Sequence, residues 1–134
     1  MTARPLRSFF HKALNGEDIV LKSKGEQFFS YTYVADAVSA MLYVLLNGEN
    51  GVAYNISAES CNVHLKDFAM ACADWAGKNV VFELPSEVER KGFSVATQAI
   101  LDNTKIKYLG WSPIYDICSA INRTLDIISN NCLV

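Results

Sequence analysis

The sequence predicts an α/β fold, or α+β for this piece taken by itself, from two observations. Segments in which apolar residues recur every three or four positions alternate with short runs of aromatic and β-branched residues, which are typical of helices and strands respectively. In addition, 51% of the 134 residues are hydrophobic, which is enough for the buried core of one domain. No repeat, linker or low-complexity segment divides the chain, so we expect residues 1–134 to form a single unit.

Bulk properties exclude several classes of partner. The formal net charge is −2, with acidic and basic residues mixed along the chain, so no basic face for nucleic acid is expected. No apolar run reaches the roughly 20 residues of a membrane-spanning helix, and the N-terminus has no secretory signal. The four cysteines are scattered and lack histidines at ligand spacing, which favours reduced thiols over a metal site. These properties predict a cytoplasmic protein without a nucleic-acid or membrane partner.

In the first half of the chain, the patterns predict two helices and three strands. Asn15-Gly16 and Asn47-Gly48 end the helices, since both residue types accept the left-handed conformation found at helix ends. Aromatic and β-branched residues predict the strands. The expected elements are a helix just after residue 5, a strand at 18–22, a strand at 28–34, a helix at 35–46 and a strand at 52–56. The second helix has one apolar face, formed by Val38, Met41, Leu42 and Leu45.

The middle of the chain predicts a third helix and a further strand. Apolar residues keep the helical period from Leu65 to Ala76, and Gly77 terminates the helix. His64 lies in the N-cap region, where we expect a structural role. A strand is expected at 80–84, whereas the polar segment 85–97 has no clear pattern.

Two more helices are expected towards the C-terminus. Asp102 is a good N-cap for a short helix through Tyr108, which Gly110 can end with a positive φ. Ser112-Pro113 supplies an N-cap and a proline at the first helical position, so the last helix is expected to begin there. Its expected apolar stripe consists of Ile114, Ile117, Cys118, Ile121, Leu125 and Ile128.

Four segments, taken in order, resemble motifs of the extended short-chain dehydrogenase/reductase family of nucleotide-sugar epimerases and dehydratases. They are FFHKALNGEDIVLKSKG at 9–25, YTYVADAVSA at 31–40, GVAYNIS at 51–57, and DNTK followed by LGWSP between 102 and 113. They are similar to the family's helix and glycine-ended strand, R-D-F-x-Y-V-D-D-V-V-x-A, G-x-x-Y-N-I-G, and D-x-[ST]-K with L-G-W-x-P. Each motif alone occurs by chance in many proteins, but their order covers nearly the whole chain.

The resemblance implies a function of which this chain carries only a part. In the family, an N-terminal Rossmann half binds NAD(P) at a glycine-rich turn, and a Tyr-x-x-x-Lys pair with a serine or threonine performs the chemistry. Neither pattern occurs here. The resemblance therefore implies that residues 1–134 are the C-terminal substrate-binding region, with no catalytic and no cofactor-binding residue. Its partners would be a UDP- or dTDP-linked sugar and the missing Rossmann half, and NAD(P) is implied for the parent alone.

The same resemblance points to Arg90, Lys91 and Asn55 as substrate-binding residues. Arginines normally clamp the substrate diphosphate, because their planar fork matches phosphate oxygens. The family's second arginine corresponds to Arg90, and Lys91 could assist as a point charge. The first one falls at Phe29, followed by Ser30 in place of an aspartate, and an apolar ring cannot neutralise a diphosphate.

Motif residues also have structural interpretations that need no ligand. A carboxylate at Asp36 would meet the positive end of a helix dipole. Asn55 can bond loop backbone with its amide, and Lys105 is expected to be a solvated helix residue. Trp111 is expected to fill space beneath the last helix.

Three functions remain open from the sequence. The first is the nucleotide-sugar-binding part of an epimerase or dehydratase, inactive without its cofactor-binding half. The second is a non-enzymatic interaction module, and the third is part of a reductase acting on a non-nucleotide substrate, which the loss of arginine at Phe29 would fit. In each case the apolar face of the helix at 35–46 is expected to promote self-association.

Overall fold

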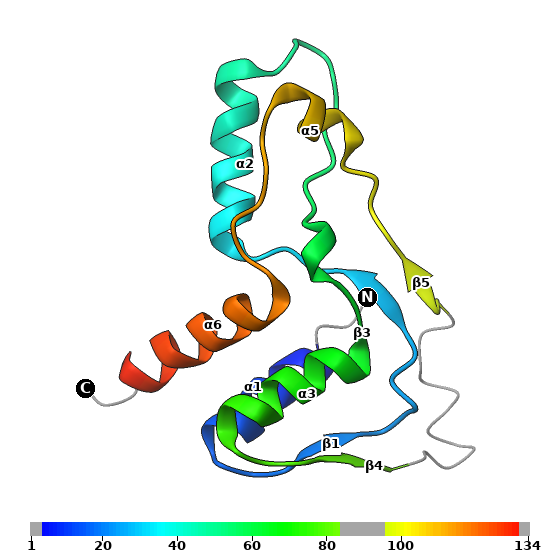
Figure 1. The fold of residues 1–134 in the computed structure, drawn as a ribbon, viewed down its shortest axis with the longest axis vertical. Helices are drawn as coiled ribbons and strands as arrows, with labels where there is room; N and C mark the ends of the chain where they lie inside the picture. Colours follow the sequence, from blue (N-terminus) through cyan, green and yellow to red (C-terminus); the bar gives the residue numbers. More distant parts are fainter. Residues whose placement is uncertain (1–3, 84–95, 132–134) are drawn as a thin grey trace.

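The computed structural model describes residues 4–83 and 96–131, and the predicted mixture of helices and short strands is confirmed. Three helices and one strand pair gather at the wide end of the molecule in Figure 1: α1 (Arg4–Leu14), α3 (Leu65–Ala76), α6 (Ile117–Asn131), β1 (Ile19–Leu21) and β4 (Val80–Phe82). The narrow end contains α2 (Val34–Asn47) and α5 (Thr104–Leu109). No helix within the described ranges is long and apolar enough to cross a membrane.

The strands form two small sheets. β1 and β4 are parallel, with Ile19 opposite Val80. In the second sheet, β2 (Phe28–Ser30) lies between β3 (Asn62–His64), which is antiparallel to it, and β5 (Gln98–Ala99), which is parallel to it. The second sheet therefore joins three segments that are far apart in the sequence, and its middle strand contains Phe29, where the resemblance led us to expect an arginine.

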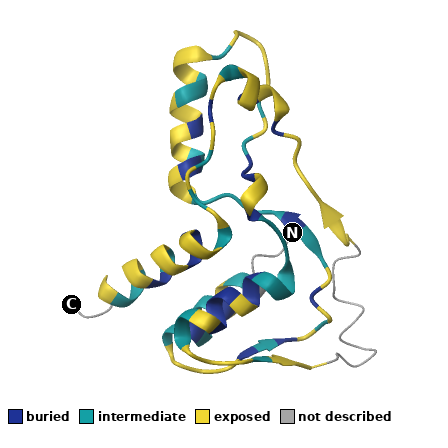
Figure 2. Cartoon of the chain, in the orientation of Figure 1, coloured by how far each residue is buried: buried dark blue, intermediate teal, exposed yellow. Residues whose placement is uncertain are grey.

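The larger hydrophobic core lies between α1, α3 and α6. Helical spacing places Phe68, Ala69 and Cys72 on the inner face of α3, which is the dark stripe of α3 in Figure 2. Burial raises the pKa of the Cys72 thiol to about 12, so this cysteine behaves as a small apolar side chain. The buried members of this cluster are Phe9, Ala13, Ile19, Leu21, Phe68, Ala69, Ala71, Cys72, Ala73, Ile121 and Leu125.

A smaller core lies between α2 and α5. Ala40, Ile106 and Trp111 are buried there, and the partly buried side chains packed against them are Tyr43, Val44, Tyr54 and Ile56. The position expected for Trp111 is therefore wrong: its indole packs between α2 and α5 and not beneath the last helix. The chain reverses at Gly110, whose φ of 108° confirms the expected positive φ and turns the indole back towards α2.

Both ends of α3 agree with the sequence. His64 is the N-cap, and its backbone N–H donates to the Asp67 carboxylate at 3.2 Å in a capping box. Gly77 ends the helix in the left-handed conformation with φ 63°. The structural role predicted for His64 is confirmed.

The expected strands differ from the structure where pairing depends on distant segments. The stretch 52–56 is not a strand, because no described strand lies beside it. β2 ends at Ser30, before the expected end at residue 34, because Val34 already begins α2. β3 and β5 have no clear sequence signal and form by pairing with β2. The expectation for 85–97 lies mostly outside the described residues.

The beginnings of the last two helices are also corrected. The N-cap of α5 is Asn103, although the Asp102 carboxylate does accept the Thr104 N–H at 2.9 Å. α6 begins at Ile117 and not after Ser112, because the Asp116 carboxylate accepts the Ser119 N–H at 2.8 Å and caps the helix there. Consequently, two members of the expected stripe are exposed, namely Ile114 and Cys118.

Gly25 provides a stringent test of the packing between β1 and α3. Its φ is +67°, and an added Cβ would lie 2.7 Å from side-chain atoms of Leu21 and Lys66. We expect Gly25→Ala to lower the free energy of unfolding by about 2–4 kcal/mol, combining left-handed strain with overpacking. Gly51→Ala is the matched control, since Gly51 has φ +78° but open space around it, so only about 1–2 kcal/mol is expected. Equal losses in urea unfolding would contradict the close packing at Gly25.

The cap of α6 predicts a pH dependence. The pKa of the Asp116 carboxyl is lowered mainly by the hydrogen bond from the backbone N–H of Ser119, and to a smaller extent by the bond from the Ser119 hydroxyl. Because the folded-state pKa lies below the unfolded value, this stabilisation is present above pH of about 4 and is lost as pH falls through the folded-state pKa. We therefore expect the stability difference between the wild type and Asp116→Asn to shrink from pH 7 to pH 3 in urea titrations. Asp74→Asn, in the last turn of α3, is the control, and a constant difference for Asp116→Asn would contradict this role.

Candidate functional site

Asp36 is the central polar residue among the motif segments. It lies in the first turn of α2 and is only 1% exposed. Its two carboxylate oxygens accept hydrogen bonds from the backbone N–H groups of Ile114 and Tyr115, at 3.0 and 3.1 Å. The position at the helix N-terminus agrees with the interpretation of the sequence. The structure also shows a second role, since the two hydrogen bonds of the carboxylate fix the segment that leads into α6.

Asn55 joins two of the motif segments. Its side-chain Nδ2 donates to the carbonyl oxygen of Asp102 at 2.9 Å. Next to this contact, the buried Asn103 donates to the carbonyl of Ser57 at 3.0 Å, and the Ser57 hydroxyl donates to the carbonyl of Leu101 at 3.2 Å. These three bonds hold the stretch 55–57 against 101–103. The amide of Asn55 is thus engaged with backbone, and its predicted contact with substrate stays a prediction.

Two further bonds connect α2 with the turn after α5. The indole N–H of Trp111 donates to the Ser39 hydroxyl at 3.1 Å, and the Tyr43 hydroxyl donates to the carbonyl of Leu109 at 3.3 Å. Together with the Asp36 bonds, they tie one side of α2 to the stretch 109–115. The residues that carry the resemblance therefore contact one another from three separate parts of the chain.

The position of the family's first arginine offers no cation. Phe29 is 8% exposed and lies in β2, the middle strand of its sheet. The hydroxyl of Ser30 accepts a hydrogen bond from the backbone N–H of Leu101 at 3.0 Å, so it holds the segment after β5 against the end of β2. Arg90 and Lys91 lie outside the described residues, and their predicted phosphate contacts stay predictions.

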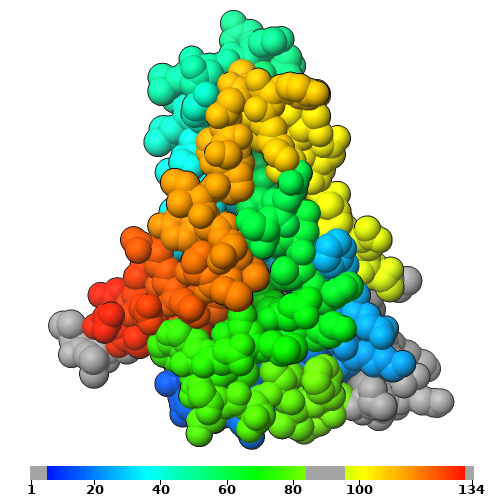
Figure 3. Space-filling view, in the orientation of Figure 1, coloured from blue at the N-terminus to red at the C-terminus, as the bar shows by residue number. Residues whose placement is uncertain are grey.

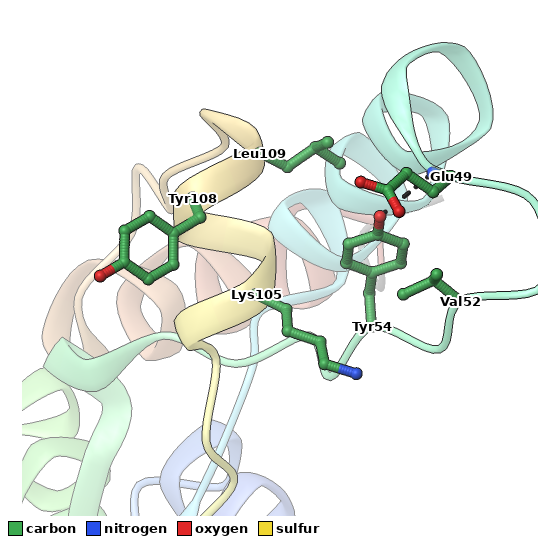
Figure 4. A pocket seen from close by; sticks show the side chains of 6 residues that line it. All are labelled: Glu49, Val52, Tyr54, Lys105, Tyr108 and Leu109. Atoms are coloured by element: carbon green, nitrogen blue, oxygen red, sulfur yellow. Dashed lines mark hydrogen bonds between the residues drawn. The ribbon is translucent and has the colours of Figure 1, made fainter.

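A first hollow lies at the narrow end of the molecule, with a volume of about 450 Å³. Figure 4 shows Lys105 extending beside Tyr54 and Tyr108 pointing away, while the Tyr54 hydroxyl accepts the backbone N–H of Glu49 at 3.1 Å. The other lining residues are Val52 and Leu109. Lys105 is exposed, as its interpretation as a solvated residue predicts. The charged groups of this hollow are the Lys105 ammonium and the Glu49 carboxylate. A single ammonium beside a carboxylate does not form a clamp for a diphosphate.

A second hollow of about 310 Å³ lies at the beginning of β2. Its lining includes Lys24, Gln27 and Thr97. The Oε1 atom of Gln27 is buried and accepts no hydrogen bond, although buried acceptors are usually paired. Gln27 precedes Phe29 by two positions, so the hollow is close to the replaced arginine position. Sequence reasoning did not identify Gln27, because a single glutamine before a strand carries no chemical signal.

The described residues contain neither a glycine-rich pyrophosphate cradle nor a cluster of metal ligands. A pyrophosphate cradle needs a glycine-rich turn that leads from a strand into a helix. No strand in residues 4–83 or 96–131 is followed by such a turn. Within the same ranges, no three histidine, cysteine or acidic side chains come close enough to hold a metal. No chemical step through NAD(P) is therefore assigned to these residues.

Comparison with known proteins gives a family match in the N-terminal part of the chain. Residues 2–57 match the model of the NAD dependent epimerase/dehydratase family. The dTDP-glucose 4,6-dehydratase of Xanthomonas campestris pv. campestris is 28% identical over 123 residues, covering 86% of this chain and 34% of the relative. The low-salt glycan biosynthesis protein Agl12 of Haloferax volcanii is 28% identical over 120 residues, covering 88% and 37%. The chain thus spans about a third of the length of these curated relatives.

The folds of solved structures match this chain over nearly its whole length. The UDP-glucose 4-epimerase of Thermotoga maritima, solved with UDP-glucose, has a TM-score of 0.74 and 26% identity over 92% of this chain and 38% of its own. The dTDP-glucose 4,6-dehydratase of Bacillus anthracis, solved with NAD, has a TM-score of 0.73 and 20% identity, again over 92% and 38%. The predicted resemblance to the extended short-chain dehydrogenase/reductase family is therefore confirmed.

Asp36→Asn tests whether the buried carboxylate holds the motif segments together. An asparagine keeps one acceptor but turns an N–H₂ donor towards the second backbone N–H. We expect the free energy of unfolding to fall by about 2–3 kcal/mol, measured as a lower urea midpoint at unchanged m-value. In the control Asp18→Asn, the amide oxygen can still accept the single exposed bond from the Asn79 N–H (3.0 Å), so the expected loss is below about 1 kcal/mol. Similar losses for both variants would contradict the central role of Asp36.

Proposed function

We propose that this chain is the C-terminal, nucleotide-sugar-binding part of an NAD(P)-dependent epimerase or dehydratase, inactive without its cofactor-binding part. The observation that carries the proposal is the match to the Thermotoga epimerase, which was solved with UDP-glucose: it covers 92% of this chain but 38% of that enzyme. At 26% identity the match supports more than a common fold. The absence of G-x-G-x-x-G and Tyr-x-x-x-Lys from the sequence assigns cofactor binding and proton transfer to the other part.

The cofactor-binding part would be the principal protein partner. The stretch 52–56 is rich in strand-forming residues, and no described strand pairs with it. The Val52 N–H and the Ile56 carbonyl already have partners within the chain, and backbone groups of such a stretch that have none are a template for strand addition. We assign this stretch to the edge of the cofactor-binding sheet, where it would join the two parts.

Ligand binding would use the region around β2. The second hollow, which Gln27 lines, is the described feature that best suits a sugar hydroxyl. The Oε1 atom of Gln27 is buried and unpaired, so a sugar hydroxyl would donate to it once the side chain turns into the hollow. We assign the phosphate contacts to Arg90 and Lys91, since Phe29 supplies no charge. The ligand class is a UDP- or dTDP-linked sugar.

The buried Phe29 favours a second candidate, a reductase part that binds a substrate without a diphosphate. That candidate predicts no preference for nucleotide-linked sugars. It also predicts no role for Arg90 in binding them, so the same titrations separate the two functions.

Calorimetric titration tests the proposed function. We expect heat of binding with UDP-glucose or dTDP-glucose and none with NAD. Arg90→Ala should weaken sugar-nucleotide binding by about 10- to 100-fold, because a charge-assisted phosphate contact contributes about 1.5–3 kcal/mol. Arg7→Ala, an exposed arginine of α1, is the control and should bind as the wild type does. Heat with NAD, or no heat with any sugar nucleotide, would contradict the proposal.

A further inference from the structure

The sequence contains three Asn-Gly pairs, at 15–16, 47–48 and 50–51. Such a pair is open to spontaneous deamidation, because glycine has no side chain to shield its backbone nitrogen from the asparagine amide. The local sequence gives all three pairs the same chemistry. Any difference between them therefore has to come from the fold.

The first pair is restrained on both of its reacting groups. The backbone N–H of Gly16 donates to the carbonyl of Ala13 at 3.0 Å. The side-chain amide of Asn15 donates to the Glu17 carboxylate at 3.2 Å. Attack of the glycine nitrogen on the amide would first have to break these bonds, so the fold protects this pair.

The second pair is restrained in the same way by the end of α2. The backbone N–H of Gly48 donates to the carbonyl of Val44 at 2.8 Å. The side-chain amide of Asn47 donates to the carbonyl of Tyr43 at 3.0 Å. Here too the last turn of the helix would have to open before the two groups could react.

The third pair has neither restraint. Among the hydrogen bonds of the described residues, none involves the side chain of Asn50 or the backbone N–H of Gly51. Both residues are exposed, and no atom lies within 4 Å of a Cβ added at Gly51. The blue-green segment that contains this pair forms the tip of the narrow end in Figure 3. The Asn50 amide can therefore turn towards the glycine nitrogen without breaking a contact.

We propose that Asn50 is a site of spontaneous deamidation, at which the chain acquires an aspartate or an isoaspartate. The backbone nitrogen of Gly51 loses its proton and attacks the side-chain carbonyl carbon Cγ of Asn50. The N–Cγ bond forms, the Cγ–Nδ2 bond breaks, and ammonia leaves with the proton. Water then opens the succinimide ring at one of its two carbonyls, which gives aspartate or isoaspartate. The reaction consumes only water.

The modification changes the turn beside the first hollow. The backbone N–H of Val52 donates to the carbonyl of Glu49 at 3.3 Å, across the reacting pair. In isoaspartate the main chain runs through the former side chain, so an additional methylene enters this turn and should break the bond. The new carboxylate also adds a negative charge next to Glu49, which lines the hollow. This inference goes beyond the proposed function and does not depend on it.

Peptide mass spectrometry of the aged full chain tests the proposal. The protein is incubated at mildly alkaline pH, because the attacking nitrogen must lose its proton, and is then cleaved after glutamate. This cleavage separates the three pairs into peptides 1–17, 27–49 and 50–59. We expect Asn50 to deamidate at least about tenfold faster than Asn15 or Asn47, the factor associated with one hydrogen bond that has to break first. In urea the three rates should converge, because the protecting bonds are lost.

Two variants complete the test. Asn50→Ser should abolish the isoaspartate that a protein isoaspartyl methyltransferase labels in peptide 50–59, at an unchanged urea midpoint, since the Asn50 side chain makes no bond. Asn47→Ser is the matched control and should leave the deamidation rate of Asn50 as in the wild type. A folded chain in which Asn15 or Asn47 reacts as fast as Asn50 would overturn the proposal. So would rates that keep the same ratios after unfolding.

Discussion

The hydrogen bonds of the buried Asp36 carboxylate are the interaction on which the narrow end of the molecule depends. A buried carboxylate is costly unless every strong acceptor site is used. Here the backbone N–H groups of Ile114 and Tyr115 supply two donors, and the N-terminus of α2 adds a favourable dipole. The chain can satisfy this requirement only if the stretch 111–116 stays extended beside α2. That stretch then delivers Trp111 into the small core and delays α6 until Ile117.

The same constraint explains why the motif residues contact each other. Once 111–116 is fixed, α5 lies close to α2, and the polar groups between them need partners in a region that is partly buried. Asn55 bonds the carbonyl of Asp102, and Asn103 bonds that of Ser57, so side-chain amides join two extended segments without strand pairing. The resemblance to the family thus rests largely on residues that hold the narrow end of the fold together.

Local patterns predicted the helices well because helical periodicity and end signals lie within the same dozen residues. His64, Gly77 and Gly110 illustrate this, since each acts on its own helix. The failures at strands involve distant partners, since 52–56 finds no described strand and β5 needs β2. The later start of α6 comes from a competing local cap, Asp116 with Ser119. The site was less predictable than the fold. The unpaired oxygen of Gln27 becomes visible only when burial is known, and Arg90 and Lys91 lie outside the described residues.

The two sides of α2 differ in what they contribute to the stability of this chain. The inner side carries the bonds from Asp36, Ser39 and Tyr43, so substitutions there should disturb the frame. The opposite side, which includes the exposed Val38, Met41 and Leu45, makes none of these bonds. An apolar surface of this kind is rarely left open, because removing it from water is favourable in proportion to its area. One helix therefore carries the bonds that hold the narrow end together on one side and an exposed apolar surface on the other.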